Sequence, residues 1–284
     1  MKTYFYSYRN GDFHVVRSFI CDIMKQYPSD EFLYYSCLPF IGQPDIPHVL
    51  SDIEGLNKTQ PYKNIGSVPS PCYVCGDETL INVHPNVCGF DAICELFRAI
   101  YKQLALKFDD EVVNYLPAID FSKIKTEPID QEIKNTRCIK LRVYLANCKA
   151  LSLQSTYFDL NPAVAELAKD FPAVRFYISN VMEGKVVAPN VVYVPDFTGG
   201  GCDLNENAYL STFCPIVAGR LSGPHSFALI KDNLLNSTKT FVCFTDLRAA
   251  AEWFPSCRSK MLWATTHDWR VAKELLAGQI RKAL

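Results

Sequence analysis

Short apolar segments alternate with amphipathic helical segments along most of this chain, and the alternation occurs twice. The first round runs strand, helix, strand over 3–8, 13–27 and 31–37. The second round has the same order, over 139–146, 161–171 and 174–179. Strands that alternate with helices of about ten residues are typical of parallel sheets with helices on both faces. The sequence therefore predicts an α/β fold with two Rossmann-like lobes.

The rest of the chain continues the same pattern. Further strands are predicted at 79–83, 191–194, 216–219 and 240–245, and further helices at 90–107, 205–213 and 226–235. A lone amphipathic helix is predicted at 269–284. The stretch 123–137 is polar and charged and has no hydrophobic period, so it marks the predicted boundary. The predicted domains are a first lobe over 1–125, a second lobe over 138–265 and a C-terminal helical segment over 266–284.

Charge and cysteine usage exclude several classes of protein. The formal net charge is −1, whereas proteins that follow nucleic-acid phosphates usually carry a basic excess, so no nucleic-acid partner is expected. No signal-like segment opens the chain, and no apolar run approaches the about 18 residues of a membrane span. The 12 cysteines are therefore interpreted as reduced thiols of a cytoplasmic protein. Cys72 and Cys75 form one CxxC without a second pair at matching spacing, which argues against a zinc site.

Ligands of open parallel sheets bind beyond the carboxyl ends of the strands, so the loops that follow strands hold the candidate site. In the first such loop, Gly11 permits a tight turn and Asp12 lies at or near a helix N-terminus. Asp12 has two interpretations that position alone does not separate: a helix cap, or a general base that faces a bound ligand.

Three loops of the second lobe complete the set. The loop 146–155 offers hydroxyl and amide donors suited to phosphate or sugar oxygens, and the loop 198–206 contains three consecutive glycines that let a backbone approach a ligand. In the loop 219–226, Gly223 suits a sharp turn and Pro224 suits the first position of a helix. Backbone N–H groups at the start of that helix, together with Arg220, predict an anion site.

Taken together and in this order, these loops resemble those of the GT-B glycosyltransferases, most closely the heptosyltransferase-like branch. In that branch a Gly-Asp turn after the first strand supplies the catalytic Asp, and the match here is Gly11-Asp12. That branch also has a Leu-x-Glu helix start and a Gly-x-x-His turn that binds the donor diphosphate. The counterparts here are Asp203-Leu204-Asn205-Glu206 and Ser222-Gly223-Pro224-His225, in which one residue separates Gly223 from His225. Arg220-Leu221 stand where the branch has an Asp. The closing helix at 269–284 is similar to the GT-B helix that packs back across the lobes.

The resemblance implies transfer of a sugar, with inversion, from a nucleotide-diphosphate donor to an acceptor hydroxyl. Asp12 would take the proton of that hydroxyl. The implied donor-binding residues are Arg220, Ser222, Gly223, Pro224, His225, Ser226, Ser152, Gln154, Ser155 and Glu206. The implied acceptor-binding residues are Asn10, His14 and His84. No DxD carboxylate pair follows a strand, so metal-independent transfer is expected, with no cofactor besides the nucleotide sugar. The acceptor would be a glycan, a lipid-linked sugar or a protein.

Two other functions compete with this interpretation. A nicotinamide oxidoreductase would show a glycine-rich fingerprint after the first strand, and that fingerprint is missing. A non-catalytic protein that binds sugar nucleotides or a partner would keep the turn at 222–226 and would not need Asp12. This second alternative stays open at the level of sequence.

Overall fold

The computed structural model describes most of the chain and divides it into two compact units. The described residues are 1–7, 10–36, 49–59, 71–83, 89–147, 159–182, 184–199, 204–220, 223–245, 254 and 257–284. Unit 1 is Met1–Lys123 with Glu252–Pro255, and unit 2 is Ile124–Ala251 with Ser256–Leu284. The division falls after Lys123, close to the predicted end of the first lobe at 125, and places the rest of the predicted boundary segment, 124–137, in unit 2.

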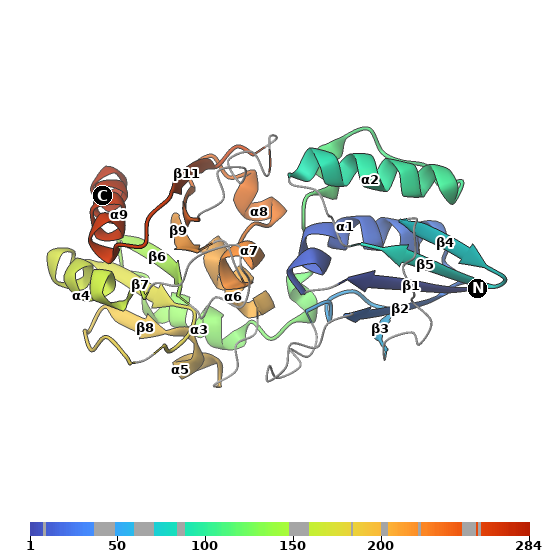
Figure 1. Ribbon diagram of the computed structural model, residues 1–284. Coiled ribbons are helices and arrows are strands. Elements are labelled where there is room, and N and C mark those ends of the chain that lie inside the picture. Colours follow the sequence, from blue (N-terminus) through green and yellow to red (C-terminus); the bar gives the residue numbers. More distant parts are fainter. Residues whose placement is uncertain are drawn as a thin grey trace. The chain divides into compact units, whose positions relative to one another are not determined.

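Unit 1 is built on a five-stranded sheet in the order β3-β2-β1-β5-β4 (Figure 1). Its strands are β1 (Lys2–Ser7), β2 (Glu31–Ser36), β3 (Leu56–Lys58), β4 (Cys72–Cys75) and β5 (Glu78–Asn82). All neighbours pair in parallel except β4, which is antiparallel to β5 at the edge. The central strand β1 therefore has its backbone fixed from both sides by β2 and β5.

Alternation along β1 separates the two faces of this sheet. Tyr4 and Tyr6 join Tyr35 and Leu80 in one buried cluster, whereas Phe5 stacks on Phe32 on the other face. The helix α1 (Asn10–Gln26) covers the same face as Phe5. Tyr34 of β2 is the register partner of Phe5, and its ring meets the ring of Phe13 on α1 edge to face, with the centroids 5.3 Å apart. Ser7 shares that face with Phe5 because it lies two residues further along β1.

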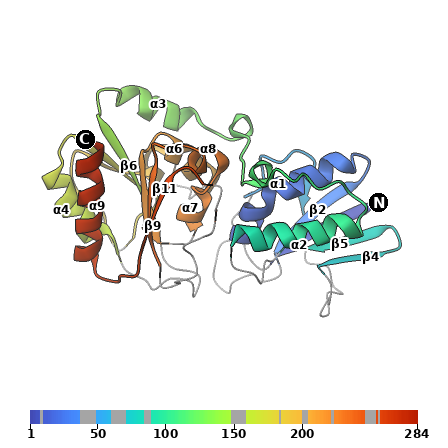
Figure 2. The ribbon, with the colours of Figure 1, turned by 90° about the horizontal axis from the view of Figure 1, so that it is seen from above.

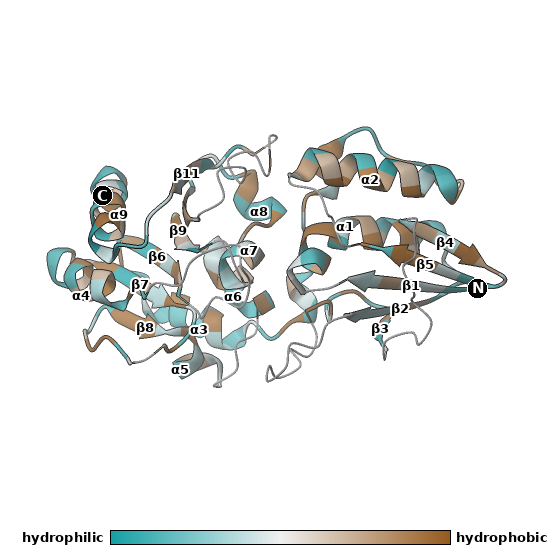
Figure 3. Ribbon diagram, in the orientation of Figure 1, coloured by the Kyte–Doolittle hydropathy of each residue, from teal (hydrophilic) through white to brown (hydrophobic). Residues whose placement is uncertain are grey.

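A second helix, α2 (Phe90–Gln103), packs against α1 in unit 1. The rings of Phe19 on α1 and Phe97 on α2 stack at 4.2 Å. The buried residues of α2 recur at helical spacing, and hydrophobic and hydrophilic residues alternate along its ribbon (Figure 3). Two short 3₁₀ helices, η1 (Val112–Tyr115) and η2 (Phe121–Lys123), complete the described part of this unit.

Unit 2 contains a six-stranded parallel sheet in the order β11-β10-β9-β6-β7-β8. Its strands are β6 (Leu141–Ala146), β7 (Val174–Ile178), β8 (Val191–Tyr193), β9 (Ile216–Arg220), β10 (Thr240–Phe244) and β11 (Lys260–Ala264). The sequence analysis predicted the first five of these and missed β11. That strand lies at the edge of the sheet and is only half-buried, so its apolar run is short and weakly marked.

Helices cover both faces of this second sheet. They are α3 (Glu127–Asn135), α4 (Asn161–Asp170), α5 (Val194–Thr198), α6 (Leu204–Thr212), α7 (Gly223–Phe227), α8 (Lys231–Leu234) and α9 (Trp269–Ala283). Figure 2 shows α4 and α9 side by side on one face and α6, α7 and α8 on the other. The single helix predicted at 226–235 is two short helices instead, with an extended residue, Ile230, between them.

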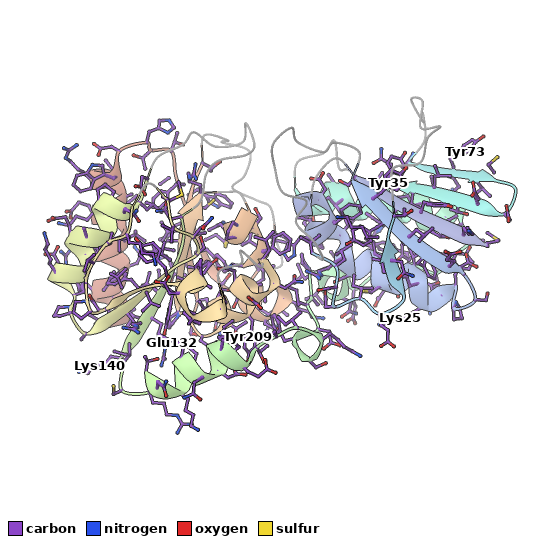
Figure 4. The ribbon with its side chains drawn as sticks, turned by 90° about the horizontal axis from the view of Figure 1, so that it is seen from below. Lys25, Tyr35, Tyr73, Glu132, Lys140 and Tyr209 are labelled. Atoms are coloured by element: carbon purple, nitrogen blue, oxygen red, sulfur yellow. The ribbon has the colours of Figure 1, made fainter. Side chains whose placement is uncertain are left out.

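The polar stretch at 123–137 was predicted as the boundary between the lobes because it lacks a hydrophobic period, and no helix was predicted in it. It holds α3, which begins near Pro128 and buries Ile129. Tertiary contacts hold the helix: the Tyr209 hydroxyl of α6 donates to Asp130 at 2.7 Å, and the guanidinium of Arg175 on β7 donates to Glu132 at 2.9 Å. Figure 4 labels Glu132 on this helix and Tyr209 next to it. Such contacts stabilise a helix whose own hydrophobic pattern is weak.

A buried lysine that the sequence analysis did not single out closes the C-terminal end of α6. Lys239 donates to the carbonyl oxygens of Ser211, Thr212 and Cys214 at 2.6, 3.0 and 2.8 Å. Ser211 and Thr212 are the last two residues of α6, where carbonyl groups lack the regular partner four residues on, and an ammonium also complements the helix dipole. Burial lowers the pKa of Lys239 to about 8. The contact fixes α6, whose first turn carries Glu206.

The closing helix α9 belongs to unit 2. Its buried residues join α4 and strand residues of the second sheet in one apolar core, which is why the helix is amphipathic. Its predicted packing across the lobes stays a prediction. In the part of the chain that the structure describes, no helix has the length and apolar character needed to cross a membrane.

Candidate functional site in two parts

Each sheet has a point at which the direction of strand addition reverses. In unit 1 the chain adds β2 and β3 on one side of β1 and then places β5 on the other side. In unit 2 it adds β7 and β8 on one side of β6 and then places β9 on the other. Ligands of open α/β sheets bind at the carboxyl ends of the strands that flank such a reversal. The residues that follow β1, β6 and β9 are therefore the ones to inspect.

Asp12 lies at this edge of unit 1, in contact with the end of the central strand. The helix α1 begins at Asn10, so Asp12 is its third residue and not a cap before it. The hydroxyl of Ser7, the last residue of β1, donates to Asp12 Oδ2 at 2.7 Å. Ser7 is fully buried and Asp12 is half-buried. A carboxylate in the first turn also interacts favourably with the helix dipole.

His14, one of the predicted acceptor-binding residues, is fully buried in unit 1. Its Nδ1 lies 3.1 Å from a guanidinium nitrogen of Arg17, which also forms a buried ion pair with Asp52. Asp52 Oδ2 in turn accepts the backbone N–H of Asp120 at 3.1 Å. Burial lowers the pKa of Arg17, and the charge of Asp52 opposes that effect. These contacts connect α1 to the loops that contain Asp52 and Asp120. The cluster therefore stabilises the fold of unit 1. Of the other predicted acceptor residues, Asn10 is the first residue of α1 and His84 lies outside the described residues.

A cavity of about 900 Å³ also opens in unit 1, lined by later residues of α1 and by loop residues that include Asp52, Asp109 and Asp120. It also reaches Asp30 and Phe32, at the amino end of β2. Its lining contains none of the predicted site residues. The cavity therefore does not belong to the carboxyl edge of the sheet.

In unit 2 the two strands that flank the reversal come into very close contact at their carboxyl ends. Gly219 of β9 is the register partner of Ala146 of β6. A Cβ on Gly219 would stand 2.6 Å from the Cβ of Ala146 and 2.8 Å from its carbonyl oxygen. Only glycine fits here, and this steric reason for Gly219 is not visible in the sequence.

A fully buried asparagine fixes the chain on either side of the loop after β6. The amide nitrogen of Asn147 donates to Asp159 Oδ1 at 2.8 Å and to Asn161 Oδ1 at 3.2 Å. Its amide oxygen accepts the backbone N–H of Leu160 at 3.3 Å. Asn161 is the first residue of α4. The sequence analysis placed Ser152, Gln154 and Ser155 of this loop in the donor site, and these three lie outside the described residues.

The structure brings Arg220 and the turn at 223–226 together at the end of β9. Arg220 was predicted in the loop and is the last residue of the strand, fully buried. Gly223 begins α7 with φ = +30°, a left-handed value that favours glycine, and Pro224 follows it. Ser226 is half-buried on the same short helix, and Ser222 lies outside the described residues.

His225 on α7 has the surroundings of a core residue. Its ring is fully buried, meets Phe241 edge to face at 6.0 Å and, among the described residues, has no hydrogen-bond partner for either nitrogen. Burial lowers the pKa of His225 to about 4, so the ring is neutral at pH 7. A neutral ring supplies no positive charge to a phosphate.

Glu206, another predicted donor-binding residue, lies in the first turn of α6 and is largely buried. The neighbouring Asn207 accepts a hydrogen bond from the hydroxyl of Tyr144 on β6 at 2.9 Å. The first turn of α6 is thereby attached to the strand that flanks the reversal. Among the described residues, no group of three or more His, Cys, Asp and Glu side chains could hold a metal ion. Metal independence itself stays a prediction.

Solved structures with the same architecture are glycosyltransferases. E. coli heptosyltransferase WaaC with ADP is 10% identical, with a TM-score of 0.52, and the match covers 100% of both chains. WaaC with ADP-2-deoxy-2-fluoro heptose is 11% identical, with a TM-score of 0.52, and the match covers 98% of this chain and 100% of that one. A glycosyl transferase family 9 protein of Veillonella parvula is 12% identical over 98% of this chain and 91% of its own, with a TM-score of 0.49. No protein-family model and no curated protein sequence matches the chain.

The WaaC structures match this chain from end to end, through both parallel-sheet units. This likeness confirms the predicted fold class, the heptosyltransferase-like GT-B fold. At 10–11% identity it establishes the fold, and the chemistry has to be argued from the residues of this chain.

Proposed function

We propose that this protein transfers a sugar from a nucleotide-diphosphate donor to an acceptor hydroxyl, with inversion and without a metal ion. The observation that carries the proposal is the placement of Asp12 and Arg220, each at the carboxyl end of a strand that flanks a reversal of its sheet. One group is a carboxylate and the other a cation, which suits a base and a diphosphate ligand respectively.

In this scheme Asp12 accepts the proton of the acceptor hydroxyl as its oxygen attacks the anomeric carbon of the donor. The bond from that carbon to the diphosphate breaks, and negative charge develops on the leaving group. Arg220 and the backbone N–H groups at the start of α7 would stabilise this charge. The neighbour WaaC with bound ADP supports an adenine nucleotide as the first donor to try.

The experiment is a panel assay of nucleoside diphosphate release. ADP-, GDP- and UDP-hexoses are incubated with the protein and a set of sugar acceptors, in EDTA and in manganese. We expect acceptor-dependent release that EDTA leaves unchanged. Turnover that disappears in EDTA and returns with manganese would contradict the metal-independent scheme. Nucleotide-sugar binding without turnover by any acceptor would favour the non-catalytic alternative.

Replacement of Arg220 by alanine is expected to weaken binding of ADP, GDP or UDP by about 5- to 150-fold, the 1–3 kcal/mol of a charge-assisted contact. Affinity for the nucleoside alone should not change, because the nucleoside carries no phosphate. Calorimetry measures both, with melting temperature as the test of folding. Arg142→Ala is the matched control, because Arg142 lies near the opposite, amino end of β6 in the same unit. Equal affinities of the wild type and Arg220→Ala for every diphosphate would remove Arg220 from the site.

A further inference from the structure

The contact between Ser7 and Asp12 is the strongest feature of the described structure that the proposed function leaves unused. Ser7 closes β1, the central strand of the five-stranded sheet, which pairs with β2 on one side and β5 on the other. Its backbone lies between Ser36 of β2 and the end of β5, and the N–H of Val83 donates to the carbonyl of Tyr6 at 2.9 Å. The backbone at the end of β1 is therefore held by hydrogen bonds to the strands on both sides.

The side chain of Ser7 is directed by the same geometry. It lies on the face of the sheet that α1 covers, and its hydroxyl meets Asp12 Oδ2 at 2.7 Å. A buried hydroxyl that donates to a carboxylate at this distance forms a short, charge-assisted bond. The bond fixes the rotation of the carboxylate relative to the sheet edge.

We propose that Ser7 is a positioning residue for Asp12, a role that rests on the proposed function. The hydroxyl of Ser7 holds one carboxylate oxygen and so orients the group that takes the proton of the acceptor. A base must lie within hydrogen-bond reach of the proton it removes, and a small misplacement lowers the rate strongly. Ser7 itself touches neither donor nor acceptor in this scheme. Its loss should therefore change turnover and leave nucleotide affinity unchanged.

The first experiment tests the contact without turnover. The side-chain carboxyl ¹³C resonance of Asp12 is assigned by its loss in Asp12→Asn. We expect this resonance to move in Ser7→Ala and to keep its wild-type position in Ser18→Ala. Ser18 is a matched control, because its hydroxyl also makes a 2.7 Å bond in unit 1, to the carbonyl of Leu116, and lies further along α1. An unmoved resonance in Ser7→Ala would overturn the proposal.

The second experiment uses the donor and acceptor that turn over fastest in the panel assay. We expect Ser7→Ala to lower kcat about 10-fold, with ADP, GDP and UDP affinities within twofold of the wild type, and Ser7→Thr to recover most of the lost rate because it keeps the hydroxyl. In the Asp12→Asn background, Ser7→Ala should change kcat by less than twofold, because the two residues act as one unit.

The outcomes separate the two proposals. A wild-type kcat in Ser7→Ala, beside an inactive Asp12→Asn, overturns the role of Ser7 and leaves the proposed function standing. The same 10-fold loss in both backgrounds would show that Ser7 acts on rate without Asp12, which also overturns the role. Full turnover in Asp12→Asn removes the base from the proposed function, and the positioning role of Ser7 falls with it.

Discussion

Asp12→Asn is expected to lower turnover by about 100-fold or more while leaving donor affinity unchanged, because an amide does not accept the proton of the acceptor hydroxyl. The fold should tolerate the change. Asn keeps an oxygen that accepts the bond from Ser7, and the lost charge at the third position of α1 costs about 0.3–1 kcal/mol of helix stabilisation. Melting temperature, donor affinity and transfer rate are measured on one sample.

Asp91→Asn supplies the matched control for this prediction. Asp91 is the second residue of α2, an exposed carboxylate in the first turn of a neighbouring helix in the same unit. Its replacement should cost a similar amount of stability and leave turnover at the wild-type level. Full activity in Asp12→Asn would make Asp12 a residue that stabilises its helix and would favour a non-catalytic protein.

His225 is expected to make the folded state sensitive to acid. The pKa of its imidazole is lowered to about 4 in the folded chain from an ordinary 6.5, because burial penalises the charged form. Between these values the unfolded chain binds the proton more tightly than the folded chain does. The contribution of neutral His225 to the free energy of unfolding is therefore fully present above pH 6.5, and it is lost as the pH falls toward 4. The expected loss is about 2 kcal/mol between pH 7 and pH 4.5.

The measurement compares His225→Phe with the wild type by urea denaturation at both pH values. A phenyl ring packs on Phe241 as the imidazole does and carries no proton, so the variant should lose less stability on acidification. The difference between the two proteins should grow by about 2 kcal/mol from pH 7 to pH 4.5. His267→Ala, at an exposed position, should show no such growth. An equal response to pH in wild type and His225→Phe would contradict the assignment of the titration to His225.

The hydrophobic pattern of the sequence predicted those strands and helices in which burial of one face makes apolar residues recur at regular spacing. The central strands β1, β6 and β9 and the helices α1, α2 and α4 lie close to their predicted ranges, because each buries an apolar face. The sequence did not predict elements whose formation depends on contacts with residues far away in the chain or that lie at the edge of a sheet. The helix α3 depends on Tyr209 and Arg175, which lie about 40 to 80 residues away along the chain, and β11 is a half-buried edge strand.

The candidate site divides in the same way. The sequence indicated Asp12 and Arg220 because each follows an apolar strand, and the structure places both at the carboxyl edge. It did not indicate Ser7, Asn147 or Gly219, because their roles exist only through a partner: a carboxylate five residues on, the start of α4, and the Cβ of Ala146 on the neighbouring strand. Nor did the sequence indicate that the ring of His225 is fully buried.

The sequence by itself determined the two α/β units and the loops that follow their strands, since the alternation of strand and helix and the residues that follow each strand are local properties. The tertiary structure alone decided which strand ends are neighbours, which side chains are buried and which hydroxyl meets which carboxylate. Those are properties of pairs of residues, often far apart in the chain, and no window of sequence contains them.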